Sequence, residues 1–245
     1  MTPGNATAPS EGSTERKKIA LFDLDHTLIP IDSDYAWGEF TIQRGWVDPV
    51  AFKHQNDMFY AQYQAGTLDV HAYVRFATQA IRQQGATNSI AAHAGFMGSV
   101  IAPAIKKVAT SLVQAHIDAG DTVIIITATN EFVTRPIADA FGVKELIAVE
   151  LERDEVPGGT GWITGEIKGV PSAREGKVTR MEQWLVQHQL GWADVESTFY
   201  TDSINDLALM EKVTHPVATN PDDRLRAIAA GRGWRILDLF PKDSL

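Results

Sequence analysis

Three short apolar segments of this sequence each end in a polar residue, with helical patterns between them. They are IALF, followed by Asp23; TVIIIT, which ends in Thr127; and STFYT, followed by Asp202. Apolar runs of this length predict buried strands. Strands that alternate with helices predict a doubly wound, mostly parallel α/β sheet. Because ligands of such sheets lie beyond the carboxyl ends of the strands, we expect the three polar residues to converge on one site.

The stretch between the first two strands has no strand pattern. Over residues 35–116, apolar residues recur at three- and four-residue steps, which predicts an inserted helical cap. The core domain would then comprise residues 18–34 and 117–245. Residues 1–17 are rich in Pro, Gly, Ser, Thr and charge, which predicts a disordered leader. The stretch LERDEVPGGTGWITGEIKG predicts two strands around a Gly-rich turn.

Charge and composition narrow the class of partner. The 245 residues carry a net charge of −9, which argues against nucleic acid or an anionic membrane as the main partner. A small phosphorylated metabolite needs only local positive charge and stays possible. The chain has no Cys, so thiolate catalysis and Cys-based metal sites are excluded. No apolar run approaches a membrane span and no secretory signal is present, so a cytoplasmic protein is expected.

Asp23 and Asp25 lie two residues apart after the first strand, where their negative charges repel. A carboxylate can attack phosphorus and form an aspartyl-phosphate. A second acid can protonate the leaving alcohol and then deprotonate water. Mg²⁺, which prefers oxygen ligands, would relieve the repulsion, and Thr27 would hydrogen-bond the acid or the phosphate. The alternative is that these residues only form the turn and cap at a strand end.

Two later segments offer groups that suit a phosphate. Thr127 and the backbone N–H groups from Ala128 onwards suit an anion at a helix start, although a Thr there is most often an N-cap. Lys177, at the start of a predicted helix, would neutralise phosphate charge. Its alternative is a solvated surface lysine.

The segment DSIND forms a second acidic cluster. Asp202 would complete a Mg²⁺ site with Asp23, Asp206 would be a ligand or support it, and Asn205 would donate to phosphate or water. The alternative is a helix N-terminus whose dipole favours acids. Acid pair, hydroxyl, lysine and acid pair, each at a strand end or helix start, together predict a site of phosphoryl transfer.

With these motifs, the sequence resembles the haloacid dehalogenase superfamily, specifically its phosphoserine-phosphatase-like branch (subfamily IB). DLDHT, ITAT, the GK at 176–177 and DSIND are similar to its four motifs in order, and GWITGEIKG to a hairpin of that branch. The resemblance implies a Rossmann-like core with strand order 3-2-1-4-5 and a cap inserted after the first strand. Thr127–Ala128 departs from the Ser–Gly of several relatives but keeps the hydroxyl.

The resemblance also assigns roles by position. Asp23 would be the nucleophile and Asp25 the general acid/base. Thr127 and Lys177 would bind phosphate, and Asn205 would place phosphate or water. The implied Mg²⁺ site consists of oxygen donors: Asp23, the backbone carbonyl of Asp25, and Asp202, with Asp206 in support.

The stretch IPIDSDYAW is where the substrate would be recognised. Asp32 sits where the phosphoserine enzymes carry an acid that holds the substrate's amine, although a helix N-cap at Ser33 or Asp34 would explain the acids equally well. Trp37 is expected to face the substrate. An arginine of the cap would bind a substrate carboxylate, with these candidates: Arg44, Arg75 and Arg82. The variant DHTLIPIDSDYAW is more similar to a subgroup in which some members hydrolyse histidinol phosphate, an amine without a carboxylate.

We therefore predict a Mg²⁺-dependent phosphatase for a small phosphomonoester, either histidinol phosphate or phosphoserine. One alternative is a receiver-like phospho-acceptor module, which would lack both an acid at Asp25 and the cap. Another is a non-catalytic protein that binds a phosphate ligand on the same fold, against which the intact acid set argues. Replacing Asp25 by Asn would separate these possibilities.

Overall fold

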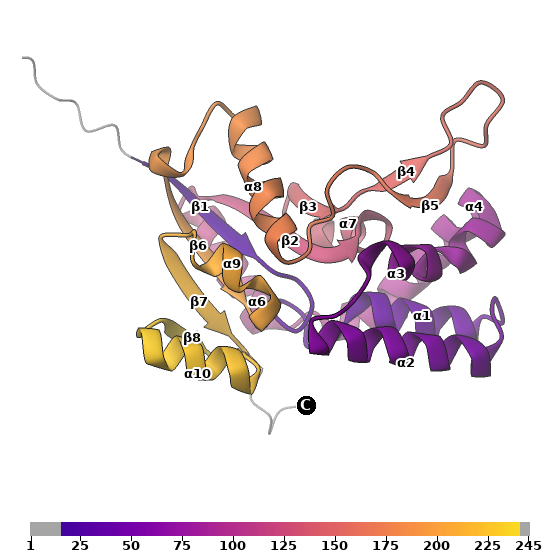
Figure 1. The fold of residues 1–245 in the computed structure, drawn as a ribbon, viewed down its shortest axis with the longest axis horizontal. Coiled ribbons are helices and arrows are strands. Elements are labelled where there is room, and N and C mark those ends of the chain that lie inside the picture. Colours follow the sequence, from indigo (N-terminus) through magenta and orange to yellow (C-terminus); the bar gives the residue numbers. More distant parts are fainter. Residues whose placement is uncertain (1–15, 241–245) are drawn as a thin grey trace, which may run out of the picture.

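A computed structural model describes residues 16–240, and its centre is a six-stranded parallel sheet (Figure 1). The strands, in the spatial order β3-β2-β1-β6-β7-β8, are β3 (Glu145–Val149), β2 (Thr122–Asn130), β1 (Lys17–Phe22), β6 (Val195–Thr201), β7 (His215–Thr219) and β8 (Arg235–Leu237). The two remaining strands, β4 (Leu151–Arg153) and β5 (Ile163–Ile167), form the predicted antiparallel hairpin. Without that hairpin, the order is the expected 3-2-1-4-5 with β8 added at the edge, which confirms the predicted α/β fold class.

The helices fall into two groups along the chain. Between β1 and β2 lie α1 (Ser33–Gln43), α2 (Pro49–Ala65), α3 (Val70–Ala77), α4 (Gln79–Phe96), a π-helical turn (Met97–Ile101), α5 (Ala102–Ala104) and α6 (Lys107–Asp118). After β2 lie α7 (Glu131–Ala140), α8 (Glu175–Gln187), α9 (Leu207–Met210) and α10 (Asp223–Arg232), with short 3₁₀ turns at Trp192–Asp194 and Ile204–Asp206. Among the described helices, none alone is long and apolar enough to cross a membrane, and one pair bent by 93° passes that test by length and composition only.

The central strand β1 is buried on both faces. Successive side chains of a strand point to opposite faces. Phe22 therefore packs in one cluster with Val113 of α6, whereas Leu21 packs in another with Met181 of α8. This double burial explains why the strand is a continuous apolar run rather than an alternating one.

Helices α1 to α4 lie beyond the end of β1 and, in Figure 1, form a group to the right of the sheet together with the hairpin. Helix α3 contacts β5 of that hairpin. Helix α6 instead packs against β2, and its Ala109 and Val113 are part of the core. The predicted cap end at residue 116 thus falls inside a helix that covers the sheet, and we propose that the cap ends before α6. The predicted leader, residues 1–17, lies outside the described residues except for its last two, of which Lys17 begins β1.

Candidate active site

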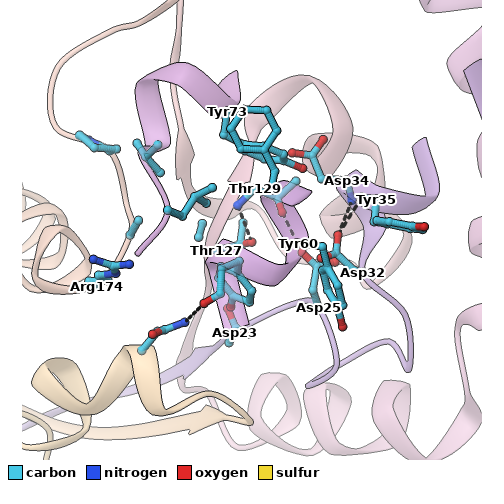
Figure 2. A pocket seen from close by; sticks show the side chains of 18 of the residues that line it. Asp23, Asp25, Asp32, Asp34, Tyr35, Tyr60, Tyr73, Thr127, Thr129 and Arg174 are labelled. Atoms are coloured by element: carbon cyan, nitrogen blue, oxygen red, sulfur yellow. Dashed lines mark hydrogen bonds between the residues drawn. The ribbon is translucent and has the colours of Figure 1, made fainter. Parts of the chain in front are cut away.

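The carboxyl ends of β1 and β2 and the turn after β6 meet at one pocket of about 220 Å³. Asp23, Thr127 and Asn205 each line it, although more than 70 residues separate each from the next along the chain. The opposite wall belongs to α1, α2 and α3. Figure 2 shows side chains from both walls turned toward one space. Parallel topology explains this convergence, because the strands all end at the same edge of the sheet.

Asp23 lies at the floor of the pocket with 5% of its surface exposed. Its backbone N–H donates to the carbonyl of Tyr200 on β6 (2.9 Å), so the hydrogen bonding of the sheet continues past the end of β1. Its Oδ1 accepts from Nζ of Lys177 at 2.7 Å, and the same Nζ donates to Oδ2 of Asp206 at 2.6 Å. Burial raises the pKa of Asp23 to about 6, against the opposing effect of the lysine charge.

Lys177 is itself buried, so its charge depends on these partners. Burial acts to lower its pKa, but Asp206 and Asp23 outweigh this effect and raise the pKa, so the ammonium group stays charged. The lysine reaches the floor because the chain before α8 is tightly folded. A Cβ on the preceding Gly176 would lie 2.0 Å from the carbonyl oxygen of Pro171, so only glycine fits there.

Asp202 follows β6 and lies beside Asp23, with Thr27 between them. The hydroxyl of Thr27 lies 3.3 Å from Oδ2 of Asp23 and 3.2 Å from Oδ1 of Asp202. It also accepts from the backbone N–H of Asp202 at 3.0 Å. One hydroxyl proton does not satisfy two carboxylates. Burial, followed by the charges of Asp23 and Asp206, raises the pKa of Asp202 well above its usual value.

Asp23 and Asp202 suit a Mg²⁺ ion, because their carboxylates offer the oxygen ligands that Mg²⁺ prefers. Among residues 16–240, no three His, Asp or Glu side chains are arranged to hold a metal ion. The implied site needs only two side chains, Asp23 and Asp202, with the backbone carbonyl of Asp25, and water supplies other ligands of Mg²⁺. Asp206 is already occupied, because its Oδ2 accepts from both Lys177 and the hydroxyl of Thr201 (2.7 Å). A supporting role suits it better than direct ligation.

Asp25 is held by two hydrogen bonds at the pocket wall. Its Oδ1 accepts from the backbone N–H of Ser33 and its Oδ2 from the hydroxyl of Thr129, both at 2.8 Å. Burial, followed by the charge of Asp32, raises its pKa to about 6. A carboxyl group that titrates near neutral pH can both donate and accept a proton. Sequence reasoning missed Thr129, although its position two residues after Thr127 on one strand places both on the same face.

Thr127 and Ala128 both line the pocket at the end of β2. The hydroxyl of Thr127 accepts from the backbone N–H of Thr129 at 3.1 Å. The N-cap of α7 is Asn130, whose Oδ1 accepts from the N–H of Val133. The alternative interpretation of Thr127 as an N-cap is therefore wrong, and its hydroxyl lies at the pocket.

The first turn of α1 places more acids in the pocket. Asp32 is the N-cap itself, since its Oδ1 accepts from the N–H groups of Asp34 (3.0 Å) and Tyr35 (2.8 Å). The alternative N-caps at Ser33 and Asp34 are thus not the ones observed. Asp32 and Asp34 both line the pocket, as do tyrosines that sequence reasoning also missed: Tyr35, Tyr60, Tyr63 and Tyr73.

Trp37 lies away from the pocket, and the expectation that it faces the substrate is wrong. Only 1% of its surface is exposed, and its ring stacks on Phe40 and His93 with Phe96 at its edge. It stabilises the packing of α1 against α4. Helix α1 is enclosed by neighbouring helices, so some of its side chains face the pocket and others face those helices. The closeness of Trp37 to the first motif in the sequence did not show which of the two it faces.

The expected arginines of the cap are also elsewhere. Arg75 pairs with Glu166 at 3.0 Å, Arg82 donates to the carbonyl of Arg75, and Arg44 lies over the ring of Phe40. The pocket is lined instead by Arg174, from the loop before α8. That loop follows the hairpin, and no periodic pattern in the sequence indicates where it folds.

Asn205 lines the pocket and also contacts the cap. Its Nδ2 donates to the backbone carbonyl of Tyr63 near the end of α2 at 3.1 Å. The predicted contact with phosphate or water stays a prediction. The observed bond joins the loop after β6 to the cap.

Residues 20–211 match the family model of haloacid dehalogenase-like hydrolases. The chain belongs to this family. It is similar to a histidinol-phosphatase from Neisseria meningitidis serogroup C (strain 8013), with 40% identity over 223 residues that cover 91% of this chain and 99% of the relative. It is also similar to a phosphoserine phosphatase from Mycobacterium tuberculosis (strain ATCC 25618 / H37Rv), with 29% identity over 89% of this chain and 70% of the relative.

Solved structures agree with the fold of this hydrolase. A protein of unknown function from Bordetella pertussis Tohama I has a TM-score of 0.86 at 44% identity, covering 92% of this chain and 100% of its own. A substrate-bound phosphoserine phosphatase has a TM-score of 0.62 at 14% identity and shares the fold over 91% of this chain and 93% of its own. Family and relatives together identify a phosphomonoester hydrolase, and its fold is that of the phosphoserine phosphatases.

Proposed function

We propose that this hydrolase is a Mg²⁺-dependent phosphatase that forms an aspartyl-phosphate on Asp23. The observation that supports it is the 2.7 Å pair between Asp23 and Lys177 below a pocket that Asp25 also lines. Lys177 favours the ionised form of Asp23, which is the form that attacks phosphorus. Asp25 donates a proton to the leaving oxygen and then takes one from the water that hydrolyses the intermediate.

The Mg²⁺ ion would be held by Asp23, Asp202 and the backbone carbonyl of Asp25. It would offset the negative charge of the phosphoryl group while the carboxylate approaches it. Thr127 and the backbone of Ala128 lie at the end of β2, where we expect them to bind the phosphoryl oxygens. Lys177, placed beneath Asp23, adds positive charge at the same point.

For the substrate we favour a small amino-alcohol phosphate, namely histidinol phosphate. The pocket of about 220 Å³ lies beneath helices and suits a small metabolite better than a phosphoprotein. Asp32 and Asp34 line the side that the leaving group would occupy. Among the described residues that line the pocket, Arg174 is the one Arg or Lys, and Figure 2 shows it on the opposite side from these acids.

Phosphoserine is the second candidate substrate. Arg174 favours it, because a guanidinium group binds a carboxylate well. The amine and carboxylate of phosphoserine share one carbon, however, so an amine bound at Asp32 would bring the carboxylate next to Asp34. We therefore expect histidinol phosphate to be the better substrate.

Phosphate release tests this proposal. With Mg²⁺, the wild type should hydrolyse histidinol phosphate, and Asp25→Asn should lower kcat by about 10²–10⁴-fold because the general acid is lost. A receiver-like module or a non-catalytic binding protein would keep its function in Asp25→Asn. A wild type that releases no phosphate from any small monoester in the presence of Mg²⁺ contradicts the proposal.

A further inference from the structure

Asp34 is an acid of the pocket that the hydrolysis described above does not use. It lies in the first turn of α1, two residues after the N-cap, and 5% of its surface is exposed. Its Oδ1 accepts from Nδ2 of Asn130 at 3.2 Å, and the ring of Tyr73 lies beside it (Figure 2). Asn130 ends β2 and is the N-cap of α7, and Tyr73 belongs to α3. Two other parts of the fold thus contact this side chain of α1 at the pocket wall.

The charged groups that act on Asp34 are themselves acids, namely Asp32 and Asp25. Lys177 lies at the floor, paired with two other carboxylates, and Arg174 lies on the other side of the pocket (Figure 2). Burial, followed by the charge of Asp32, raises the pKa of Asp34 to about 7. A buried carboxylate among like charges gains most from a cation that enters with the ligand.

The wall around Asp34 is aromatic. Tyr35, Tyr60 and Tyr73 line the pocket, and Figure 2 shows Tyr73 beside Asp34. Aromatic faces attract cations and stack with flat rings. A carboxylate beside tyrosine rings therefore suits a flat, protonated ring with an N–H donor, such as an imidazolium group.

The geometry points to Asp34 and Tyr73 as the residues that bind a second, basic group of the substrate, next to the ammonium group received by Asp32. This inference rests on the proposed function and deepens it, because it defines the substrate as a phosphate ester of an amino alcohol whose side chain carries a basic ring. The same carboxylate repels the carboxylate of an amino-acid phosphate. Asp34 therefore selects for the dibasic ester and against the amino acid.

The experiment compares four phosphate esters as substrates of the purified full chain with Mg²⁺. Histidinol phosphate carries an amine and a basic ring, phosphoethanolamine only an amine, phosphoserine an amine and a carboxylate, and p-nitrophenyl phosphate none of these. In Asp34→Asn, kcat/KM for histidinol phosphate should fall about tenfold or more through KM, which is the usual worth of a hydrogen bond to a charged group. The values for phosphoethanolamine and p-nitrophenyl phosphate should change less than about twofold, and that for phosphoserine should rise.

Two further variants separate recognition from structural damage. Tyr73→Phe keeps the ring and removes the hydroxyl, so it should lower kcat/KM for histidinol phosphate alone, by a smaller factor. Asp118→Asn on the exposed surface of α6 is the matched control and should change none of the four values. An equal loss on all four substrates in both pocket variants, or an unchanged value for histidinol phosphate, overturns the inference.

The wild-type values distinguish this failure from failure of the proposed function. If the wild type hydrolyses p-nitrophenyl phosphate but does not prefer histidinol phosphate to phosphoethanolamine, Asp34 does not bind a basic ring and the phosphatase proposal survives. If the wild type hydrolyses none of the four esters, both proposals fall.

Discussion

Asp34 shows how one residue can lower stability while serving recognition. Its pKa is raised from 3.8 to about 7, mainly by burial. A carboxyl with a raised folded-state pKa stabilises the fold when protonated, and this stability is lost as the pH rises from the unfolded value through about 7. A bound cation would restore this stability, because it pairs with the ionised form of Asp34.

We therefore predict that Asp34→Asn stabilises the free protein increasingly as the pH rises. Between pH 5 and pH 8, the gain in the free energy of unfolding over the wild type should grow by roughly 2–3 kcal/mol. Urea unfolding at the two pH values measures it. Exposed Asp57, whose pKa is lowered by its bond to Tyr35, provides the control, since it is ionised at both pH values and Asp57→Asn should change stability equally at pH 5 and pH 8. A gain that does not depend on pH would contradict the burial argument.

At the scale of the element, the start of α8 determines where Lys177 lies. Gly176→Ala would place a Cβ 2.0 Å from the backbone oxygen of Pro171, so the helix start must shift. We expect a loss of about 1–3 kcal/mol in stability and a large fall in kcat, because Lys177 moves away from Asp23. Gly231→Ala in α10 is the matched control, since a Cβ there meets nothing within 4 Å and should add about 0.5–1 kcal/mol. Equal behaviour of the two variants in unfolding and turnover would refute the packing argument.

The end of α2 is the element through which the cap contacts the loop after β6 and helix α10. Nδ2 of Asn205 donates to the carbonyl of Tyr63, and Nη2 of Arg224 donates to the carbonyl of Gln64 at 2.9 Å. Arg224 lies outside the pocket, so its replacement tests cap docking without touching the reacting groups. A cap that opens more often binds substrate less tightly.

For Arg224→Ala we predict faster hydrogen exchange at the end of α2 and a KM raised a few fold, with kcat less affected. Arg226→Ala, on the same helix, removes a pair with Asp238 instead and should leave both quantities unchanged. Exchange mass spectrometry of peptides from the end of α2 and steady-state kinetics provide the measurements. If exchange there is equally slow in both variants, the contact does not hold the cap.

At the scale of the whole molecule, the sequence predicted those features of the fold and the site that a short stretch of residues indicates by itself. The run TVIIIT was predicted as a buried strand and is observed as the first part of β2, because a short run of β-branched residues has a clear strand signal. Convergence at the pocket followed from parallel topology. Asp23 and Asp202 directly follow their strands, and Thr127 lies where the regular pairing of β2 with β3 stops, although β2 extends to Asn130.

The features that the sequence did not predict depend on how distant helices and loops pack together. An amphipathic pattern looks the same on α6, which covers the sheet, as on a helix of the cap, so the sequence could not show the cap end before α6 that we propose. Trp37 near the first motif is enclosed by α4, and the pattern of one helix does not show what packs against it. Arg174 and Tyr73 reach the pocket only through the arrangement of a loop and a cap helix.

Metal binding should couple the two central strands of the molecule. Asp23 follows β1 and Asp202 follows β6. Burial raises the pKa of both carboxyl groups, and the charge of Asp23 raises that of Asp202 further. A ligand present at 100 times its Kd stabilises the fold by about 2.7 kcal/mol, which for a domain of this size corresponds to roughly 5–10 °C in Tm. We predict an increase of this order when Mg²⁺ is added at pH 7.5, and loss of phosphatase activity when the metal is removed by chelation.

Asp202→Asn should raise the Tm of the metal-free protein, because a buried charge is gone, and should abolish the increase due to Mg²⁺. The control Asp118→Asn should behave as the wild type. A full Mg²⁺ shift in Asp202→Asn would place the ion elsewhere.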